Sequence, residues 1–378
     1  DTGLVQIWTL QGALVQEFQS EVKHVDFVCF SPDGTKILTI GACPDPKKTV
    51  WLWDLSGNEL ARLEGHTDRI SSACFSPNGK YILTASQDLT VKIWNIDGEN
   101  WLSFDLESSS GYVPIAFSPD GNRFIFRLDA FEGVVSLYDL KENSIRTFSG
   151  HDHHVDFLHF SPNGSLVLGI SQKDGKCFIW DWKWDEQWRF VLNVNRILSV
   201  HIFPDGSGFY TGSADGTIYC WNWEGKETGR FDRYNETKFT NLCFSPDGKY
   251  MLSDSGKRLL WETQGSEIPV TGFQVNGDVL SSCFTPDNSC FLTSYYDGFA
   301  EIWNLKGEKI LRFDGVKGIH DSACFSPDGQ LVLTWQTGSS QETGGQIWNI
   351  KGELLHYFEG AIKTSCFSPD SKRVLIGY

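Results

Sequence analysis

The chain has 378 residues, more than the roughly 250–300 at which a single hydrophobic core stops growing, so its length predicts several domains or a repeated unit. Aromatic residues make up 14% of it and accompany 37 glycines and 13 prolines, a composition typical of many short strands joined by turns. The formal net charge of −16 argues against a nucleic-acid-binding surface, and no apolar run reaches the about 18 residues of a membrane span. The expected partners are therefore proteins or peptide segments.

The ten cysteines do not have the pattern of a disulfide framework. Six of them occupy one repeat position, directly before the phenylalanine of a recurring turn, so they are equivalent to one another and are predicted to be buried thiols. No CxxC or Cys/His spacing indicates zinc, and no sequence motif indicates a cofactor. This pattern favours a reducing, cytoplasmic location. The six are Cys29, Cys74, Cys243, Cys283, Cys324 and Cys366.

Two interleaved series of residues divide the chain into nine copies of a repeat of about 42 residues. One series is the proline of the turn Phe-Ser-Pro-Asp-Gly and its variants, and the other is an aromatic anchor between successive turns. The prolines are Pro32, Pro77, Pro119, Pro162, Pro204, Pro246, Pro286, Pro327 and Pro369. The anchors are Trp8, Trp53, Trp94, Tyr138, Trp180, Trp221, Trp261, Trp303 and Trp348.

The first predicted elements are strands at residues 4–9 and 14–19, the third and fourth strands of a copy. The chain therefore begins inside a repeat. The best preserved copy has alternating strands at 70–75, 80–86 and 90–95, followed by a fourth after a tight turn. Four such strands form one antiparallel sheet, which cannot bury both faces unless neighbouring copies stack against it. This is the pattern of a β-propeller blade.

The last predicted strands, 364–367 and 373–377, are the first and second strands of a copy, so they complement the two at the start. We therefore expect an all-β fold, a single closed β-propeller of nine four-stranded blades that leaves no free sheet edge at the junction. A cut at an arbitrary point of a longer array is the alternative, and it would rarely leave complementary halves. The expected division is one propeller over 1–378, with 1–20 and 361–378 in the closing blade and 21–360 in eight complete blades.

The best preserved copy resembles the WD-repeat (Trp-Asp repeat) family, and in particular its bacterial-type arrays. Gly65-His66, Thr84, Asp88 and Trp94 stand where that family places its Gly-His pair, hydroxyl residue, aspartate and tryptophan. The resemblance implies a β-propeller in which His66, Thr84, Asp88 and Trp94 form a hydrogen-bonded tetrad. It spans the whole chain, and it is specific for the fold and almost silent about function.

Most other copies lack part of this tetrad. Gly150-His151 is the only further Gly-His pair, Gly169 replaces the hydroxyl residue of one copy, and Ser255 replaces the aspartate of another. We therefore expect stability to depend mainly on apolar packing between blades.

Two lengthened loops are the leading candidates for a binding surface. The turn between the second and third strands is longer at 41–49 and 336–346, in the copies on either side of the predicted closing blade. In the WD-repeat fold such turns lie on the face that commonly binds ligands. Surface loops also tolerate insertion without any function, which explains either loop taken alone. The candidate residues are Pro44, Asp45, Lys47, Lys48, Gln336, Ser339, Gln341 and Glu342.

The aromatic run Trp182, Trp184 and Trp188 is a second candidate, because it continues beyond a predicted strand into a turn. Exposed aromatic side chains are suited to anchoring a partner, whereas packing against the next blade is the commoner role. His151, His153 and His154 crowd one loop, but His151 belongs to the Gly-His pair, so we predict no metal site.

These features together predict a non-enzymatic protein-interaction module. The resemblance to arrays fused to signalling modules indicates the sensor or regulatory propeller of a larger, STAND-like signalling protein. A free-standing constitutive scaffold of a multiprotein complex is the alternative. A propeller enzyme would need convergent polar groups in the central channel, where the repeat places small or apolar residues. We predict no catalytic residue and no cofactor, and the oligomeric state is left open.

Overall fold

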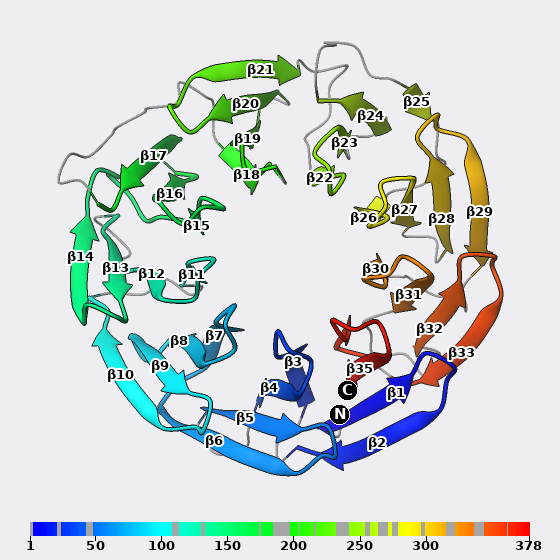
Figure 1. Cartoon of the computed structure of the whole chain (residues 1–378), viewed down its shortest axis with the longest axis horizontal. Helices are drawn as coiled ribbons and strands as arrows, with labels where there is room; N and C mark the ends of the chain where they lie inside the picture. The colour runs from blue at the N-terminus through cyan, green and yellow to red at the C-terminus, as the bar shows by residue number, and fades with distance from the viewer. Residues whose placement is uncertain are drawn as a thin grey trace. The chain divides into compact units, whose positions relative to one another are not determined.

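A computed structural model of the chain describes residues 3–20, 24–42, 48–107, 113–129, 133–173, 175–183, 197–203, 205–214, 217–231, 242–253, 258–263, 271–273, 279–295, 299–314, 322–335, 344–360 and 362–378. Strands are the regular elements of these residues, and 35 of them are present (Figure 1). None of the described residues forms a helix of the length and apolarity that a membrane crossing requires.

The recurring turn explains why the strands form hairpins. In the first copy, the amide of Ser31 donates to the carbonyl of Lys36 over 2.9 Å, and the amide of Gly34 donates to the carbonyl of Ser31 over 2.8 Å. The carboxylate of Asp33 accepts the hydroxyl of Ser31 at 2.6 Å and the amide of Thr35 at 3.0 Å. Gly34 takes a φ of 68°, which favours glycine because it has no Cβ. Each Ser-Pro-Asp-Gly segment therefore closes a tight turn by its own side chains.

The described strands form nine antiparallel sheets, named A to I here, which confirms the predicted all-β propeller architecture. Eight sheets have four strands. Sheet E has three described strands, and the fourth strand expected there falls at residues outside the described part of the chain.

The first four sheets each contain four strands. Sheet A contains β1 (Leu4–Thr9), β2 (Leu14–Gln19), β34 (Thr364–Phe367) and β35 (Arg373–Gly377). Sheet B contains β3 (His24–Phe30), β4 (Lys36–Ala42), β5 (Lys48–Asp54) and β6 (Glu59–His66). Sheet C contains β7 (Ile70–Phe75), β8 (Tyr81–Ser86), β9 (Thr90–Asn95) and β10 (Asn100–Asp105). Sheet D contains β11 (Ile115–Phe117), β12 (Arg123–Arg127), β13 (Val135–Asp139) and β14 (Ser144–Phe148).

The remaining five sheets repeat the same meander. Sheet E contains β15 (Phe157–Phe160), β16 (Leu166–Ser171) and β17 (Lys176–Asp181), and sheet F contains β18 (Ile197–Ile202), β19 (Gly208–Ser213), β20 (Ile218–Asn222) and β21 (Glu227–Phe231). Sheet G contains β22 (Leu242–Phe244), β23 (Tyr250–Ser253), β24 (Arg258–Glu262) and β25 (Thr271–Phe273). Sheet H contains β26 (Val279–Phe284), β27 (Cys290–Tyr295), β28 (Phe299–Asn304) and β29 (Lys309–Asp314), and sheet I contains β30 (Ser322–Phe325), β31 (Leu331–Trp335), β32 (Gly344–Asn349) and β33 (Leu354–Glu359).

The chain divides into two compact units. The first comprises residues 1–44, 53–59 and 237–378, and the second comprises 45–52 and 60–236. In the first unit, apolar side chains fill the interfaces between sheets G and H, H and I, and I and A. In the second unit, equivalent layers lie between sheets C and D, D and E, and E and F. Each middle strand is covered on both faces, so its burial is nearly continuous instead of alternating.

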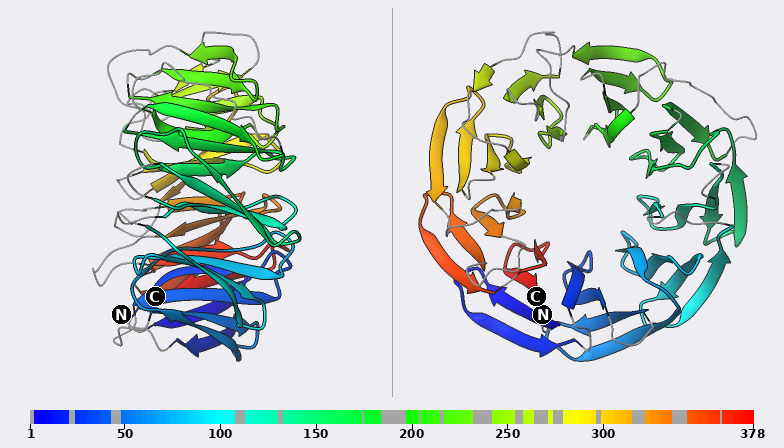
Figure 2. Two further views of the ribbon diagram at one scale, coloured as in Figure 1. Left: turned by 90° about the vertical axis from the view of Figure 1, so that its left-hand side faces the viewer. Right: turned by 180° about the vertical axis from the view of Figure 1, so that it is seen from behind.

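Sheet A joins the two ends of the chain, with the strand order β2-β1-β35-β34, as the sequence predicts. Ile7 of β1 lies opposite Leu375 of β35, and the amide of Tyr378 donates to the carbonyl of Leu4 over 3.0 Å. The carbonyl of Tyr378 in turn accepts the amide of Val25 at 3.0 Å, which links sheet A to β3. The two ends therefore lie side by side (Figures 1 and 2).

Candidate protein-binding surface

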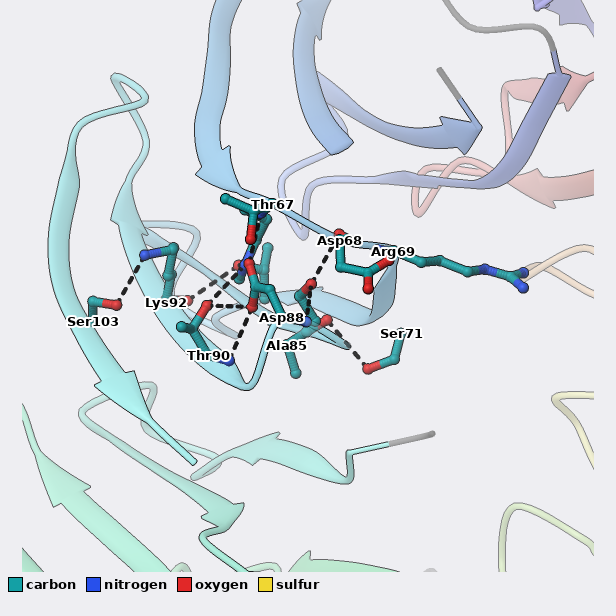
Figure 3. A network of polar contacts seen from close by, with 12 residues as sticks. Thr67, Asp68, Arg69, Ser71, Ala85, Asp88, Thr90, Lys92 and Ser103 are labelled. Carbon is teal, nitrogen blue, oxygen red and sulfur yellow. Dashed lines mark hydrogen bonds and ion pairs between the residues drawn. The ribbon is translucent and has the colours of Figure 1, made fainter. Parts of the chain in front are cut away.

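Four side chains connect the end of β6 in sheet B to the strands and loops of sheet C. Figure 3 shows part of the surrounding polar network, with Asp88, Thr67 and Thr90 labelled. Nε1 of Trp94 donates to the hydroxyl of Thr84 over 2.9 Å, and that hydroxyl lies 2.8 Å from Nε2 of His66. Nδ1 of His66 lies 2.9 Å from Oδ2 of Asp88. The tetrad residues named from the sequence are therefore joined in one chain of hydrogen bonds.

The hydrogen-bond partners in the tetrad determine the protonation states of His66 and Asp88. Burial lowers the pKa of His66, and the opposing effect of Asp88 does not reverse this, so the imidazole is neutral at pH 7. A carboxylate only accepts hydrogen bonds, so Nδ1 of His66 carries the proton and donates to Asp88, and Nε2 accepts from Thr84. Burial by itself would raise the pKa of Asp88, but hydrogen bonds from Thr90, Thr67 and His66 outweigh it and lower this pKa.

The tetrad holds two loops together on one edge of sheet C, which we call the loop face. The amide of Thr67 donates to Oδ2 of Asp88 over 2.8 Å, which anchors the loop before β7 to the loop after β8. The amide of Gln87 donates to the carbonyl of Arg69 over 2.8 Å, and the hydroxyl of Ser86 donates to the carbonyl of Asp68 over 2.9 Å. The loops at 67–69 and 87–89 therefore form one rigid surface.

Leu89 is the unusual residue of this surface. Its φ is +65°, a left-handed conformation that costs a residue with a bulky side chain about 1–2 kcal/mol, yet its side chain is 38% exposed. The amide of Leu106 donates to its carbonyl over 2.7 Å and helps to hold this conformation. Three other copies carry glycine at this repeat position, after Asp174, Asp215 and Asp297. Sequence reasoning passed over Leu89, although this departure from glycine was the signal.

Arg69, in the loop before β7, adds a cationic group to the loop face. Its side chain extends away from the polar network (Figure 3), and it makes no ion pair with any side chain in the described part of the chain. Strained exposed residues on rigid loops are typical of functional surfaces. The loop face therefore presents an apolar and a cationic side chain on a fixed backbone.

Four other copies keep half of the tetrad. A threonine hydroxyl accepts the anchor indole in five described sheets, at distances of 2.9 to 3.3 Å. In sheet E, Gly169 offers no hydroxyl, and Nε1 of Trp180 is buried without a hydrogen-bond partner. Nε2 of His151 instead donates to the carbonyl of Gly169 over 3.1 Å. The five pairs are Trp53 with Thr39, Trp94 with Thr84, Trp221 with Thr211, Trp303 with Thr293, and Trp348 with Thr334.

Most of the loop residues named from the sequence lie outside the described residues. This holds for Pro44, Asp45, Lys47, Gln336, Ser339, Gln341 and Glu342, while the backbone of Lys48 begins β5. In the first unit, sheet A lies between sheet I and strand β3, so the sheets that bear the two long loops flank it. A binding role for these loops stays a prediction.

Trp182 of the aromatic run is part of the packed interior and is only 9% exposed. Its Nε1 donates to the carbonyl of Gly164 over 2.8 Å, and the guanidinium of Arg123 lies 4.0 Å from the centre of its ring. This tryptophan therefore serves packing, which the sequence left as the alternative. Trp184 and Trp188 lie outside the described residues.

The titratable groups of the described residues do not converge as a metal site. No three His, Cys, Asp or Glu side chains among them are arranged to hold a metal ion. Nε2 of His154 lies 3.2 Å from Oδ1 of Asp156, and His151 packs edge-on against Phe178 with ring centres 4.4 Å apart. The loop histidines thus have structural contacts.

The six equivalent cysteines are free thiols, and burial raises the pKa of five of them, all but Cys29. Burial raises the pKa of Cys74, Cys324 and Cys366 to about 12 in each case, and that of Cys243 to about 11. Sγ of Cys366 lies 4.0 Å from the carbonyl oxygen of Val28 in the neighbouring sheet. These cysteines are partly buried and act as small apolar side chains with a weak donor.

The family described as "WD domain, G-beta repeat" matches residues 57–95, 142–181, 189–222 and 268–304. These four segments are WD repeats. The matched segments contain the anchors Trp94, Trp180, Trp221 and Trp303. Three of these, Trp94, Trp221 and Trp303, form Thr–Trp pairs, and Trp94 also belongs to the tetrad.

Two curated relatives match large parts of this chain. The WD repeat-containing protein WDS homolog of Arabidopsis thaliana is 28% identical over 243 residues, which cover 60% of this chain and 46% of the relative. Apoptotic protease-activating factor 1 of Rattus norvegicus is 24% identical over 376 residues, which cover 90% of this chain and 28% of the relative. This WD-repeat chain thus spans less than half the length of these curated relatives.

A solved structure shows the same fold. Chaetomium thermophilum Sqt1, bound to the N-terminus of the ribosomal protein L10, superposes with a TM-score of 0.61 at 17% identity, covering 85% of this chain and 96% of that one. At this identity the likeness concerns the propeller fold alone.

Proposed function

We propose that this WD-repeat chain is a protein-interaction module that binds partner proteins on its loop face and performs no covalent chemistry. The observation that carries the proposal is Leu89, a strained and exposed apolar side chain held by the tetrad where other copies have glycine. Strain retained at a position where glycine would relieve it indicates a role for the side chain. Arg69, on the other loop of this face, supplies a cation, so a partner segment with an apolar and an acidic residue suits the surface best.

The two lengthened loops at 41–49 and 336–346 extend this proposal to the sheets that flank sheet A. They carry prolines, lysines and polar side chains, which suit a contact surface with a rim that solvent reaches. The net charge of −16 makes a protein partner more suitable than a nucleic acid.

Within this function, the regulatory propeller of a larger STAND-like signalling protein is the form that we favour. The support is the match to apoptotic protease-activating factor 1, which covers 90% of this chain but only 28% of that relative. A propeller of this kind thus occurs as one part of a longer chain.

A free-standing scaffold is the second candidate, and the Sqt1 likeness favours it. The match covers 96% of the Sqt1 chain, and Sqt1 was solved with the N-terminus of the ribosomal protein L10 bound. An adjoining nucleotide-binding module in the coding sequence would support the regulatory form, whereas stoichiometric co-purification with a stable complex would support the scaffold.

The test has two stages. The wild-type chain and two variants are each immobilised, and the proteins that each retains from a lysate of the source cells are identified. The affinity of the wild type and of both variants for each purified candidate partner is then measured. In the first variant Leu89→Gly relieves the left-handed strain. In the second variant both long loops are replaced by short turns. We expect each variant to fold and to weaken binding of the partner by about tenfold.

Asn143→Gly is the matched control, because Asn143 also has a positive φ of 50° but lies in the turn between β13 and β14. It should bind like the wild type. Wild-type affinity in both the Leu89→Gly and the loop variants would refute the loop face as the binding surface.

A further inference from the structure

Three neighbouring sheets of the first unit expose a row of apolar side chains, five on their last strands and Ile350 in the turn before β33. Eleven large apolar residues are exposed in the described part of the chain, and six of them belong to sheets H, I and A. Their exposed fractions run from 39% for Leu355 to 53% for Ile310. The six are Ile310, Ile350, Leu354, Leu355, Leu14 and Val15.

Contacts between the sheets bring the starts of their last strands together. The imidazole of His356 in β33 stacks against Trp8 of sheet A with ring centres 4.6 Å apart. Gly12, with a φ of 79°, lies so close to this imidazole that a Cβ there would be 2.6 Å from Nδ1 of His356. On the other side, a Cβ at Gly352 would be 2.9 Å from Leu311 of β29. The starts of β29, β33 and β2 are thus in close packing.

The three strands that carry the row are edge strands. β2, β29 and β33 each end the strand order of their sheet, and no described strand pairs with their outer edges (Figure 1). An edge strand offers unpaired backbone N–H and C=O groups, and proteins commonly protect such edges with charged side chains. β6 is protected in this way, because Glu59, Arg62 and Glu64 alternate along it.

β33 lacks this protection. Its sequence Leu-Leu-His-Tyr-Phe-Glu contains one charged residue, Glu359, at its end. The neighbouring β2 contains one as well, Glu17. An exposed edge with paired leucines and little charge is suited to accept a further strand.

The charges around β33 indicate the chemistry of that strand. Glu353 immediately precedes β33 and Glu359 ends it, and neither carboxylate makes an ion pair with a described side chain. The cations of β29 are already neutralised, since Lys309 lies 3.2 Å from Glu301 and Arg312 lies 2.6 Å from Asp314. The whole chain adds a net charge of −16, so a basic segment is attracted and a second copy of the chain is repelled.

We propose that the outer edge of β33 binds an extended peptide segment of another protein, in which apolar residues alternate with basic ones. The segment pairs with β33 as a fifth strand of sheet I. Because successive side chains of a strand point to opposite faces, one row of its residues covers Leu354 and Leu14 and the other meets Glu353 and Glu359. This site is separate from the loop face and from the function proposed for it.

Synthetic peptides test the proposal directly on the full chain. The probe is a fluorescein-labelled peptide of about nine residues in which lysine and valine alternate, long enough to span β33. A second peptide has glutamate in place of lysine, and a third has N-methylated valines that cannot pair with a strand edge. We expect the lysine peptide to bind at least about tenfold more tightly than either of the others.

Matched variants locate the site. Leu354→Lys and Leu14→Lys should each weaken binding of the lysine peptide by about tenfold, since they remove apolar contact and add like charge. Leu60→Lys on β6 is the control, because Leu60 is 46% exposed, the same fraction as Leu14. It should bind like the wild type, and so should Leu89→Gly on the loop face.

Three outcomes would overturn the proposal. These are equal binding of the lysine and glutamate peptides, retained binding of the N-methylated peptide, and wild-type affinity in folded Leu354→Lys and Leu14→Lys. Light scattering adds a fourth, because a wild-type dimer that these variants convert to a monomer would show that a second copy occupies the edge. Thermal melts of each variant establish that it is folded.

Discussion

The hydroxyl of Tyr378 donates to Oε1 of Gln6 over 3.0 Å and connects side chains that are 372 positions apart in the chain. The same oxygen accepts a hydrogen bond from Nε1 of Trp8 at 3.1 Å. The side-chain amide of Gln6 therefore joins Tyr378, which follows β35, to Trp8 of β1. Sheet A therefore has polar connections besides its backbone ladder between β1 and β35.

Tyr378→Phe removes this hydroxyl and should lower the free energy of unfolding by about 0.5–1.5 kcal/mol, the net value of one hydrogen bond. Urea denaturation measures it. Tyr81→Phe is the control, because no hydrogen bond of the Tyr81 hydroxyl is present among the described residues, and that ring stacks on Trp101 at 5.1 Å. An equal loss in both variants would contradict a specific role of the Tyr378–Gln6 bond.

Thr84→Val tests the tetrad of sheet C. The substitution keeps the shape of the side chain but removes the group that accepts from Trp94 and donates to His66. Two buried polar groups lose a partner, so the variant should be destabilised by about 1–3 kcal/mol in denaturant titrations. Thr285→Val, in a turn where the hydroxyl meets the amide of Cys290 at 3.0 Å, should cost less. A neutral Thr84→Val would show that the tetrad adds nothing to stability.

Gly169→Thr would restore the hydroxyl that sheet E lacks, yet we expect it to destabilise the protein. A Cβ at Gly169 would lie 2.5 Å and 2.6 Å from two ring atoms of Trp180, so the indole occupies the space that the new side chain needs. Overpacking of this kind costs about 1–3 kcal/mol. Gly229→Thr is the control, since no atom lies within 4 Å of a Cβ there. A stabilised Gly169→Thr variant would show that the buried indole N–H dominates.

Stability should fall as the pH falls below neutral because of His159. Burial, reinforced by the nearby positive charge of His201, lowers the pKa of His159 from 6.5 to about 4. Between pH 6.5 and 4, His159 is protonated in the unfolded chain but neutral in the folded chain. The free energy of unfolding therefore decreases as the pH falls through this window, by at most about 1.4 kcal/mol per pH unit.

His159→Ala is the variant that checks this dependence, because alanine occupies the same repeat position at Ala116. Its free energy of unfolding should decline less than that of the wild type between pH 6.5 and 4. His153→Ala serves as the control and should keep the wild-type slope. Parallel curves for all three proteins would exclude His159 as a source of the acid sensitivity.

The equivalent thiols should resist modification in the folded protein. Burial raises the pKa of Cys74, Cys324 and Cys366 from 9.0 to about 12, so their thiolate fraction near neutral pH falls about a thousandfold. Mass spectrometry after brief alkylation should find these three cysteines unlabelled in the native state and labelled in guanidinium. Rapid native labelling would show that their sulfur atoms are accessible.

The order of strands follows from local chemistry, and for this reason it was predictable. Each Ser-Pro-Asp-Gly segment closes its turn with its own side chains, as Ser31 and Asp33 do, so the number of turns and the pairing of successive strands are encoded within a few residues. The same reasoning assigned β1 and β35 to one sheet. The candidate loops were visible as extra residues, but their geometry lies outside the described part of the chain.

Other features depended on the tertiary structure because they arise from contacts between distant residues. The missing hydroxyl at Gly169 was evident in the sequence, whereas the indole of Trp180 filling its place was not. Leu354 and Leu14 resemble core residues in the sequence and are exposed because, among the described residues, no further strand pairs with the outer edges of β33 and β2. The left-handed backbone of Leu89 likewise results from loops that the tetrad holds together. The sequence by itself determined the repeat and its strands, and the packing of the sheets decided which side chains remain available to a partner.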